Sequence, residues 1–347
     1  MKVKIGELTK IKTGKLDANA SSEEGKYPFF TCSKEPLRIS TYSYDCECVL
    51  VAGNGDLNVK YYNGKFDAYQ RTYIIEDDSS GKLHMPYLYY FMESYVNELR
   101  QQAIGGVIKY IKLGNLTDAL VELPPIDHQK AIVEILEKAR RILDKRNEEM
   151  NALDDLIKAR FVELFGDPVS NSKGLKELTL PELGELGRGV SKHRPRNAPE
   201  LLGGEYPLIQ TGEVSNAGLY IENYENTYSE LGYKQSKMWK AGTLCITIAA
   251  NIAKTAILRF DACFPDSVVG FKANDKTNEI FIHYWFSFFQ AILEAQAPES
   301  AQKNINLKIL SELKVIAPDI EEQNKFATFV VQVDKSKVVD IDKKDKL

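Results

Sequence analysis

Residues 111–129 read IKLGNLTDALVELPPIDHQ, and residues 305–323 read INLKILSELKVIAPDIEEQ. The two stretches align without a gap at an offset of 194 positions, and seven of their nineteen positions are identical. Two unrelated segments of ordinary composition would share about one position. The chain therefore contains an internal repeat. The identical pairs are Ile111/Ile305, Leu113/Leu307, Leu116/Leu310, Val121/Val315, Pro124/Pro318, Ile126/Ile320 and Gln129/Gln323.

The repeat extends toward the N-terminal end of each copy. An aromatic run of the first copy falls on an aromatic run of the second at the same offset, and further upstream the offset falls to about 178. A duplicated module predicts a binding target that itself has two parts. The further aligned segments are Lys109 with Lys303, Phe66-Asp67-Ala68 with Phe260-Asp261-Ala262, Tyr87–Tyr95 with Phe281–Phe289, and Ile5-Gly6-Glu7-Leu8 with Leu183-Gly184-Glu185-Leu186.

The composition is that of a globular protein large enough for two domains. The chain has 347 residues, 44% of them hydrophobic and 27% charged, and a single core rarely serves more than about 250–300 residues. The N-terminus carries no apolar stretch of signal-peptide length. The most apolar segment, Phe281–Leu293, is too short to cross a bilayer. We therefore expect a cytoplasmic protein with no membrane contact.

The formal net charge of −4 argues against a simple basic nucleic-acid binder. Each copy is close to neutral, with 15 basic and 16 acidic side chains in residues 1–126 and 16 and 17 in residues 171–320. A DNA-binding surface must then come from local segregation of charge. Residues 188–196 supply one such run, with three arginines, a lysine and a histidine and no acid. The alternative interpretation of this run is a solvated basic loop.

The sequence indicates neither a metal site nor a cofactor. The five cysteines include no Cys-x-x-Cys pair, and only four histidines are present, so reduced structural thiols are expected. Cys46 and Cys48 lie two positions apart on an expected strand and would share one face. The chain lacks the Asn-Pro-Pro-Tyr or Asp-Pro-Pro-Tyr motif of amine methylation, a Phe-x-Gly-x-Gly methyl-donor loop and a Walker loop. An enzyme is the weaker hypothesis.

A long helix is expected between the two copies. Pro124-Pro125 ends an extended segment, and Asp127 stands at an N-cap position. From there to Phe165 apolar residues recur about every 3.5 positions, the spacing of a coiled-coil seam. Gly166 and Pro168 then end the helix. At 1.5 Å per residue, roughly 39 residues would form a rod of about 58 Å.

A second helix with the same apolar pattern begins at Ile320 and offers the long helix an antiparallel partner. Paired over 28 residues, it would start beside Phe165 and end near Lys138. Three apolar side chains of the long helix, at Ile132, Ile135 and Leu136, would then need another cover. The residues expected to pack in this seam or to form subunit contacts are Ile132, Leu136, Ile142, Leu153, Leu156, Phe326 and Val330.

The modules themselves are predicted to be mixed α/β. Runs rich in β-branched residues bounded by Gly, Asn and Asp indicate strands, and two aromatic-rich segments indicate core helices. The expected strands are Val49–Ala52, Tyr69–Ile75 and Leu244–Ile248, and the expected helices are Tyr87–Leu99 and Ile280–Leu293. The predicted fold class is α+β, with two tandem pseudo-two-fold-related modules separated by long antiparallel coiled-coil helices. The predicted boundaries are 1–126, 127–166, 167–319 and 320–347.

Duplicated modules that end in Pro-Pro-Ile-Asp-His-Gln or Pro-Asp-Ile-Glu-Glu-Gln and continue into a long helix resemble the specificity subunit of type I restriction-modification enzymes. The resemblance spans essentially the whole chain. It implies that each module is a target-recognition domain that reads one half of a bipartite double-stranded DNA sequence. It also implies that the helices fix the gap between the halves and bind two methyltransferase subunits, which restriction subunits join. Its most specific further segments are Gly25–Phe29, residues 105–137, Ala159–Pro168 and Ser300–Ile305.

Base edges and phosphates are bound mainly by Arg, Lys, Asn and Gln side chains on the loops of a rigid module. Lys109 and Lys303 are equivalent in the repeat, which favours a shared phosphate contact. The candidate DNA contacts of the first copy are Lys12, Lys15, Lys34, Asn54, Asn58, Lys60, Arg71 and Lys109. Those of the second copy are Arg188, Lys192, Arg194, Arg196, Asn251, Lys254 and Lys303.

Two other functions remain open at this point. The chain could be a DNA methyltransferase with divergent motifs, which binding of a methyl donor by the isolated chain would support. It could also be a protein–protein adaptor that uses its coiled coil and binds no DNA, which a gel-shift experiment with its partner would test.

Overall fold

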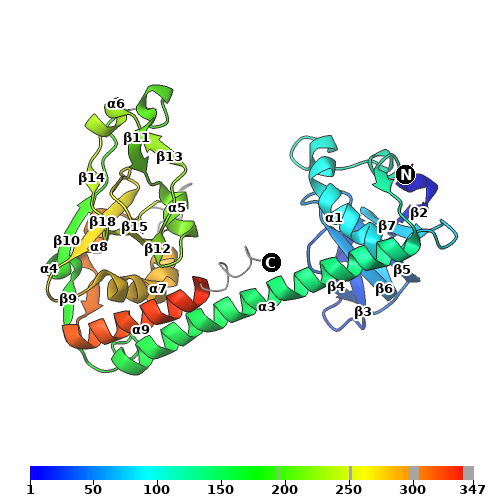
Figure 1. The fold of residues 1–347 in the computed structure, drawn as a ribbon. Helices are drawn as coiled ribbons and strands as arrows, with labels where there is room; N and C mark the ends of the chain where they lie inside the picture. Colours follow the sequence, from blue (N-terminus) through cyan, green and yellow to red (C-terminus); the bar gives the residue numbers. More distant parts are fainter. Residues whose placement is uncertain (194, 250–251, 297–304, 339–347) are drawn as a thin grey trace. The chain divides into compact units, whose positions relative to one another are not determined.

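The computed structural model describes residues 1–193, 195–249, 252–296 and 305–338. The chain forms two compact units, Met1–Arg146 (unit 1) and Asn147–Leu347 (unit 2). Helix α3 (Ile126–Phe165) contributes its first part to unit 1 and its last part to unit 2 (Figure 1). Each unit combines β-sheets with helices, so the predicted mixed α/β fold of two tandem modules is confirmed.

Unit 1 is built on a six-stranded sheet. Neighbouring strands run antiparallel except β3 and β6, which are parallel. In spatial order the strands are β2 (Thr9–Thr13), β7 (Thr72–Asp77), β5 (Tyr44–Ala52), β6 (Val59–Ala68), β3 (Tyr27–Phe30) and β4 (Leu37–Ile39). Smaller elements flank it: β1 (Lys2–Lys4), η1 (Ile5–Glu7), η2 (Ala18–Ala20), α2 (Leu113–Thr117) and β8 (Leu120–Glu122).

Both faces of the unit 1 sheet are packed. Helix α1 (Met85–Gln102) covers one face, where Val49 and Val51 of β5 are fully buried. The alternating positions Cys48 and Leu50 point to a second core on the opposite face, as the two-residue period of a strand requires. Cys46 packs against that second core as well. The prediction that the two neighbouring thiols share one strand face is therefore confirmed.

The described residues of unit 2 form two larger sheets and one two-stranded ladder. The five-stranded sheet has the order β10 (Gly184–Arg188), β18 (Val268–Ala273), β15 (Leu244–Thr247), β16 (Thr255–Leu258) and β12 (Tyr220–Ile221). The four-stranded sheet has the order β13 (Asn226–Tyr228), β11 (Leu202–Leu208), β17 (Ala262–Cys263) and β14 (Met238–Trp239), and β9 (Glu177–Thr179) pairs with β19 (Lys314–Ile316). Its helices are α4 (Leu180–Leu183), η3 (Pro199–Leu201), α5 (Thr211–Asn216), α6 (Glu230–Lys234), α7 (Glu279–Gln296), α8 (Leu307–Glu312) and α9 (Ile320–Val338).

Strand pairing corrects one detail of the repeat. Lys2 lies opposite Glu122 in the β1–β8 ladder, and Glu177 lies opposite Ile316 in the β9–β19 ladder. Because residues 122 and 316 correspond at the offset of 194, residues 2 and 177 correspond at an offset of 175. The sequence alignment at about 178, which placed Ile5 on Leu183, is therefore three residues out of register. The sequence alignment was misled because the same three residues, Gly-Glu-Leu, occur at 6–8 and at 184–186. These two segments do not occupy equivalent positions in the two units.

The repeated glutamine has the same structural role in both units. Gln129 is fully buried. Its Nε2 donates hydrogen bonds to the carbonyls of Lys82 and Pro124, both at 2.8 Å, and its Oε1 accepts one from the His84 amide at 2.9 Å. This side chain ties the first turn of α3 to the loop before α1.

The equivalent Gln323 repeats the arrangement in unit 2, where it is also fully buried. It donates to the carbonyls of Lys276 at 3.0 Å and Pro318 at 2.8 Å, and it accepts from the Thr277 hydroxyl at 2.8 Å. The glutamine at the end of each repeated stretch is thus a structural clamp between a spacer helix and its module.

Helices α3 and α9 pack antiparallel within unit 2. The rings of Phe161 and Phe165 lie 5.4 Å and 5.7 Å from that of Phe326, between ring centroids. Further along, Lys337 of α9 forms an ion pair with Asp154 of α3. The described part of α9 therefore pairs with α3 from about residue 153 to residue 165, and residues 339–347 lie outside the described residues.

The packing seam of α3 differs from the predicted one at Leu156. Leu153 packs against the unit 2 core, and Phe326 and Val330 are fully buried, as predicted. Leu156 is 48% exposed, however, whereas its neighbour Ile157 is fully buried. Ile142 is 54% exposed and belongs to no core cluster of the described residues, so its expected contact with another subunit stays a prediction. The spacing of 153, 157, 161 and 165 along α3 is that of one helical face, and Leu156 lies beside it.

Within the described residues, none of the helices is both long enough and apolar enough to cross a membrane.

Candidate nucleic-acid interface

Four loops of unit 1 meet at one end of its sheet. The Gly53 amide, directly after β5, donates to the Arg71 carbonyl at 2.8 Å, and the Gly53 carbonyl accepts from the Ile111 amide at 2.9 Å. The Gly55 amide donates to the Lys109 carbonyl at 3.0 Å. The loops at residues 53–58, 69–71 and 104–112 are thereby fixed to one another by backbone hydrogen bonds.

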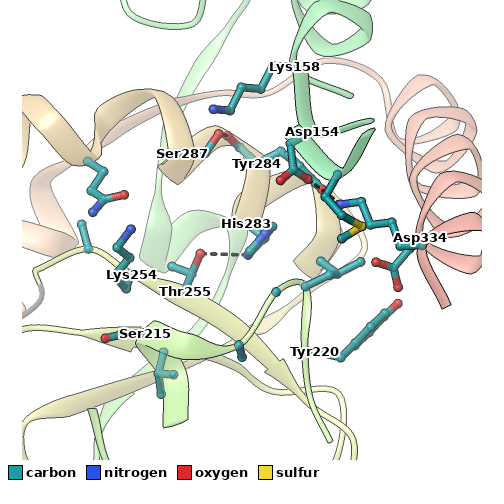
Figure 2. Close-up of a pocket in the computed structure, with 18 of the residues that line it drawn as sticks. Asp154, Lys158, Ser215, Tyr220, Lys254, Thr255, His283, Tyr284, Ser287 and Asp334 are labelled. Carbon is teal, nitrogen blue, oxygen red and sulfur yellow. Dashed lines mark hydrogen bonds and ion pairs between the residues drawn. The ribbon is translucent and has the colours of Figure 1, made fainter. Parts of the chain in front are cut away.

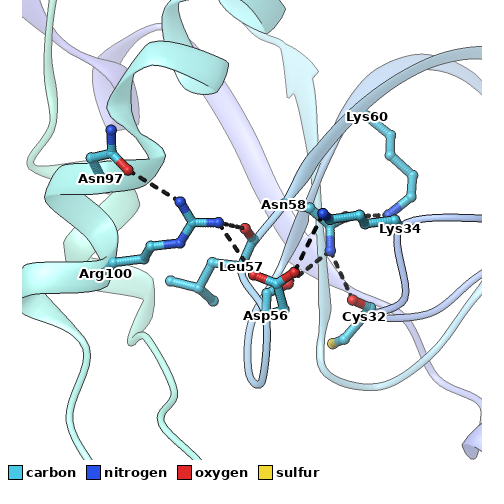
Figure 3. Close-up of polar contacts among 8 residues, drawn as sticks. All are labelled: Cys32, Lys34, Asp56, Leu57, Asn58, Lys60, Asn97 and Arg100. Carbon is cyan, nitrogen blue, oxygen red and sulfur yellow. Dashed lines mark hydrogen bonds and ion pairs between the residues drawn. The ribbon is translucent and has the colours of Figure 1, made fainter. Parts of the chain in front are cut away.

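The β3–β4 loop joins the same end through Asn58. The Asn58 Nδ2 donates to the carbonyls of Cys32 and Asp56, both at 2.8 Å, and its Oδ1 accepts from Lys60 (Figure 3). Asn58 therefore serves as a brace between loops. Burial lowers the pKa of the Lys60 ammonium.

An acidic residue organises the surrounding basic side chains. Asp56 accepts a hydrogen bond from Arg100 of α1 at 3.2 Å and lies 3.8 Å from the Lys34 ammonium (Figure 3). Arg100 also donates to the Leu57 carbonyl at 3.1 Å. Residues 31–36, 53–60, 69–71 and 100–112 together contain six basic side chains and two acidic ones. This end of unit 1 is therefore locally positive although the chain is acidic overall.

The structure brings most of the predicted first-copy residues to this end. Lys15 lies just before Leu16, which bridges to Tyr69 at the edge of the 69–71 loop. Lys12 is different, because it forms an ion pair with Glu76 and lies 4.9 Å above the Tyr44 ring, on the sheet. The Lys12 ammonium is therefore paired within unit 1. The residues on or beside the converging loops are Lys15, Lys34, Asn54, Asn58, Lys60, Arg71 and Lys109.

Unit 2 repeats the backbone junction with different side chains. The Ile248 amide donates to the Ser267 carbonyl at 3.0 Å, and the Ile248 carbonyl accepts from the Ile305 amide at 3.0 Å. Ile305 is the repeat partner of Ile111, and these bonds match those of Gly53. The same convergence of loops therefore presents Ser267 where unit 1 presents Arg71.

The basic run, which begins at Arg188 at the end of β10, reaches this junction. Arg188 donates to the Asp266 carbonyl, and the Arg196 guanidinium forms an ion pair with the Asp266 carboxylate. Lys192 is exposed, and its amide donates to the Gln235 side chain at 2.6 Å. The described residues of the run are thus held to the rest of unit 2 at several points. The predicted contacts Arg194, Asn251 and Lys303 lie outside the described residues.

Lys254 takes a different position. It lines a cavity of about 530 Å³ in unit 2, together with Thr255, His283 and residues of α3 and α9 (Figure 2). His283 Nδ1 lies 2.9 Å from the Thr255 hydroxyl, and burial lowers the pKa of this imidazole to about 4. The side chain of Lys254 therefore faces this cavity and the helix α7 beside it.

Sequence reasoning missed two of the six basic residues at this end of unit 1, Arg100 and Lys112. Arg100 forms a hydrogen bond with Asp56, which lies 44 positions earlier in the chain. Its only sequence signal is a basic residue in the last turn of a helix, which usually interacts favourably with the helix dipole.

No group of three His, Cys, Asp or Glu side chains among the described residues could hold a metal ion. The converging loops are held by a sheet and carry side chains of the types through which proteins contact DNA.

Comparison with known proteins decides the family. The model of the type I restriction modification DNA specificity domain matches residues 1–153 and again residues 173–346. The chain belongs to this family. It is 28% identical to the type I restriction enzyme EcoDI specificity subunit of Escherichia coli, over 95% of this chain and 80% of that protein. It is 23% identical to the type I restriction enzyme MjaVIII specificity subunit of Methanocaldococcus jannaschii, over 99% of this chain and 88% of that protein.

The fold agrees with that of a solved specificity subunit. The S subunit of a type I restriction-modification system from M. genitalium aligns with a TM-score of 0.58, at 17% identity, over 99% of this chain and 91% of that one. The resemblance drawn from the repeat is confirmed. The chain is a specificity subunit, a DNA-recognition component with no catalytic role of its own, and neither the methyltransferase nor the adaptor alternative is needed.

Proposed function

We propose that this specificity subunit recognises a bipartite double-stranded DNA target, and that each module reads one half-site with the loops at the end of its sheet. The observation that carries the proposal is the backbone junction built once around Gly53 and once around Ile248. The same frame presents different side chains in the two units. This arrangement suits two modules that each recognise a different short DNA sequence.

The division of labour follows the predicted boundaries. Residues 1–126 and 167–319 act as the two target-recognition domains, and residues 127–166 and 320–347 act as the helical spacers that set the gap. In the first domain Lys34, Arg71 and Lys109 stand on the converging loops, so they are the first candidates for DNA contact. Asn58 and Lys12 are committed to contacts within the fold and contribute chiefly by holding the surface in place.

A domain exchange tests the proposal. Replacement of residues 1–126 by the corresponding domain of a homologue should change one half of the methylated sequence in cells that carry the complex, and leave the other half unchanged. The reciprocal exchange of residues 167–319 is the matched control and should change only the other half. A change in both halves from either exchange would contradict independent reading.

The spacer helix offers a docking surface for the methyltransferase. Within unit 1 the α3 side chains Ile132, Ile135, Leu136, Ile142 and Leu143 are 38%, 66%, 38%, 54% and 62% exposed. Of the α3 residues in unit 1, Gln129 and Val133 are the buried ones. The first module therefore leaves this seam uncovered, which supports a partner subunit as its cover. We infer that two methyltransferase subunits bind the spacer helices and that restriction subunits join through them.

Substitution on this seam tests the partner. The double variant Ile132→Asp/Leu136→Asp should lose association with the methyltransferase while the isolated chain keeps its melting temperature. Leu231→Asp, at a 54% exposed position on α6, is the control and should keep the association. A fall in melting temperature with full methyltransferase binding would instead assign the seam to the fold of unit 1.

A further inference from the structure

A short hairpin-like loop stands at the converging end of unit 1. Ile104 and Tyr110 pair in antiparallel fashion through two backbone hydrogen bonds of 3.0 Å and 2.8 Å, and they enclose residues 105–109. We call residues 104–110 the tip loop. Its base is held by the hydrogen bond from the Gly55 amide to the Lys109 carbonyl at 3.0 Å. The base is therefore part of the junction that carries the candidate DNA contacts.

The shape of the tip loop depends on Gly105. Its φ of +121° is one that side-chain-bearing residues rarely adopt, and a Cβ added there would lie 2.6 Å from the Ile108 carbonyl oxygen. At Gly106 an added Cβ would meet nothing within 4 Å. The first glycine is required by the turn, and the second is open to substitution.

The turn presents two apolar side chains to solvent. Val107 is fully exposed, at 104%, and Ile108 is 63% exposed. Neither belongs to a hydrophobic cluster of the described residues. The end of the tip loop therefore offers two adjacent apolar side chains for contact, and Lys109 follows them directly.

We propose that the tip loop determines specificity in the first half-site, and that Val107 and Ile108 contact thymine methyl groups in the major groove. This inference rests on the proposed function, in which this end of unit 1 faces DNA. The C5-methyl of thymine is the apolar group that base edges present in that groove, and it matches an apolar tip. At the repeat offset the second copy has Ala301 and Gln302, so the chemistry at these positions differs between the two copies.

The test compares thymine with uracil, which lacks the methyl group. The complex of the full chain with its methyltransferase is bound to a duplex that carries its target, and to the same duplex with deoxyuridine in place of thymine in the first half-site. The wild-type complex should bind the uracil duplex about tenfold more weakly. The variant Val107→Ser/Ile108→Ser should bind the thymine duplex about tenfold more weakly and show no further loss with uracil.

Salt dependence and two control variants isolate the apolar contact. The logarithmic slope of affinity against salt should stay the same in Val107→Ser/Ile108→Ser, because no cation has been removed. Gly106→Ala should keep the shape of the loop, and Val169→Ser changes a 47% exposed valine in unit 2. Both should bind as the wild type does.

Three results would overturn the proposal. One is equal binding of thymine and uracil duplexes by the wild-type complex, and another is a first half-site with no thymine in either strand. The third is loss of methyltransferase association by Val107→Ser/Ile108→Ser, which would assign the tip loop to a protein contact. These results leave the proposed function standing. A wild-type complex that does not bind its methylated sequence would overturn the proposed function, and the tip-loop contact with it.

Discussion

Replacement of Gln129 by leucine should loosen the attachment of the spacer helix to the first module. The buried amide makes three hydrogen bonds, to the carbonyls of Lys82 and Pro124 and from the His84 amide. At about 1 kcal/mol net for each hydrogen bond, the loss amounts to about 3 kcal/mol. That free energy corresponds to roughly a hundredfold increase in local opening.

Hydrogen exchange followed by mass spectrometry measures this opening directly. Protection in residues 80–90 and 122–132 should fall by roughly two orders of magnitude in Gln129→Leu. Gln101→Leu, at an exposed position on α1, is the matched control and should leave protection unchanged.

The second copy supplies an internal comparison. Gln323→Leu should loosen residues 274–284 and 316–326 in the same way. Its effect should be somewhat smaller, because it releases the Thr277 hydroxyl rather than a backbone amide. A hydroxyl can rotate toward another acceptor, whereas the His84 amide cannot. Unchanged protection in both glutamine variants would refute the assignment of a clamp to this repeated residue.

Three further outcomes are expected. Insertion of four residues near Asn147–Asn151 should lengthen α3 by about 6 Å. Methylome sequencing should then show a gap between half-sites that is wider by about two base pairs. An active variant with an unchanged gap would show that the helix does not set the distance between half-sites. Lys109→Ala, and equally Lys303→Ala, should weaken binding to all duplexes and lower the salt slope by about one unit, and a changed sequence preference at constant slope would contradict a phosphate contact. Because burial lowers the pKa of His283 to about 4, only the unfolded chain gains this proton as the pH falls from 6.5 to 4, so stability should fall by about 1–3 kcal/mol over that window; a His283→Gln variant with the same pH dependence in chemical denaturation would rule this out.

The sequence predicted those parts of the fold whose signal is both local and repeated. The repeated stretches that end at Gln129 and Gln323 marked the ends of the two modules. They are similar in sequence because each glutamine is buried and makes equivalent hydrogen bonds in its own unit. The long helix was predicted from its apolar period. The exact seam was not, since Leu156 and Ile157 both fit a spacing of 3.5, and only packing into the unit 2 core selects the second.

The interface was harder to predict, because its contacts join distant segments. Residue type and loop position led to Lys34, Arg71 and Lys109, which the fold gathers at one end of the sheet. The same reasoning included Lys12, whose partner Glu76 lies on a neighbouring strand. It missed Arg100, which reaches Asp56 only once α1 packs on the sheet. Such pairings depend on strand register and helix placement, which the residue pattern does not specify.

The central claim is that two modules read two half-sites. Methylome sequencing of cells that carry this subunit with its methyltransferase tests that claim most directly. The account predicts one methylated sequence made of two short specified parts, separated by an unspecified gap of constant length. A single uninterrupted methylated sequence, or two parts whose separation varies from site to site, would contradict it.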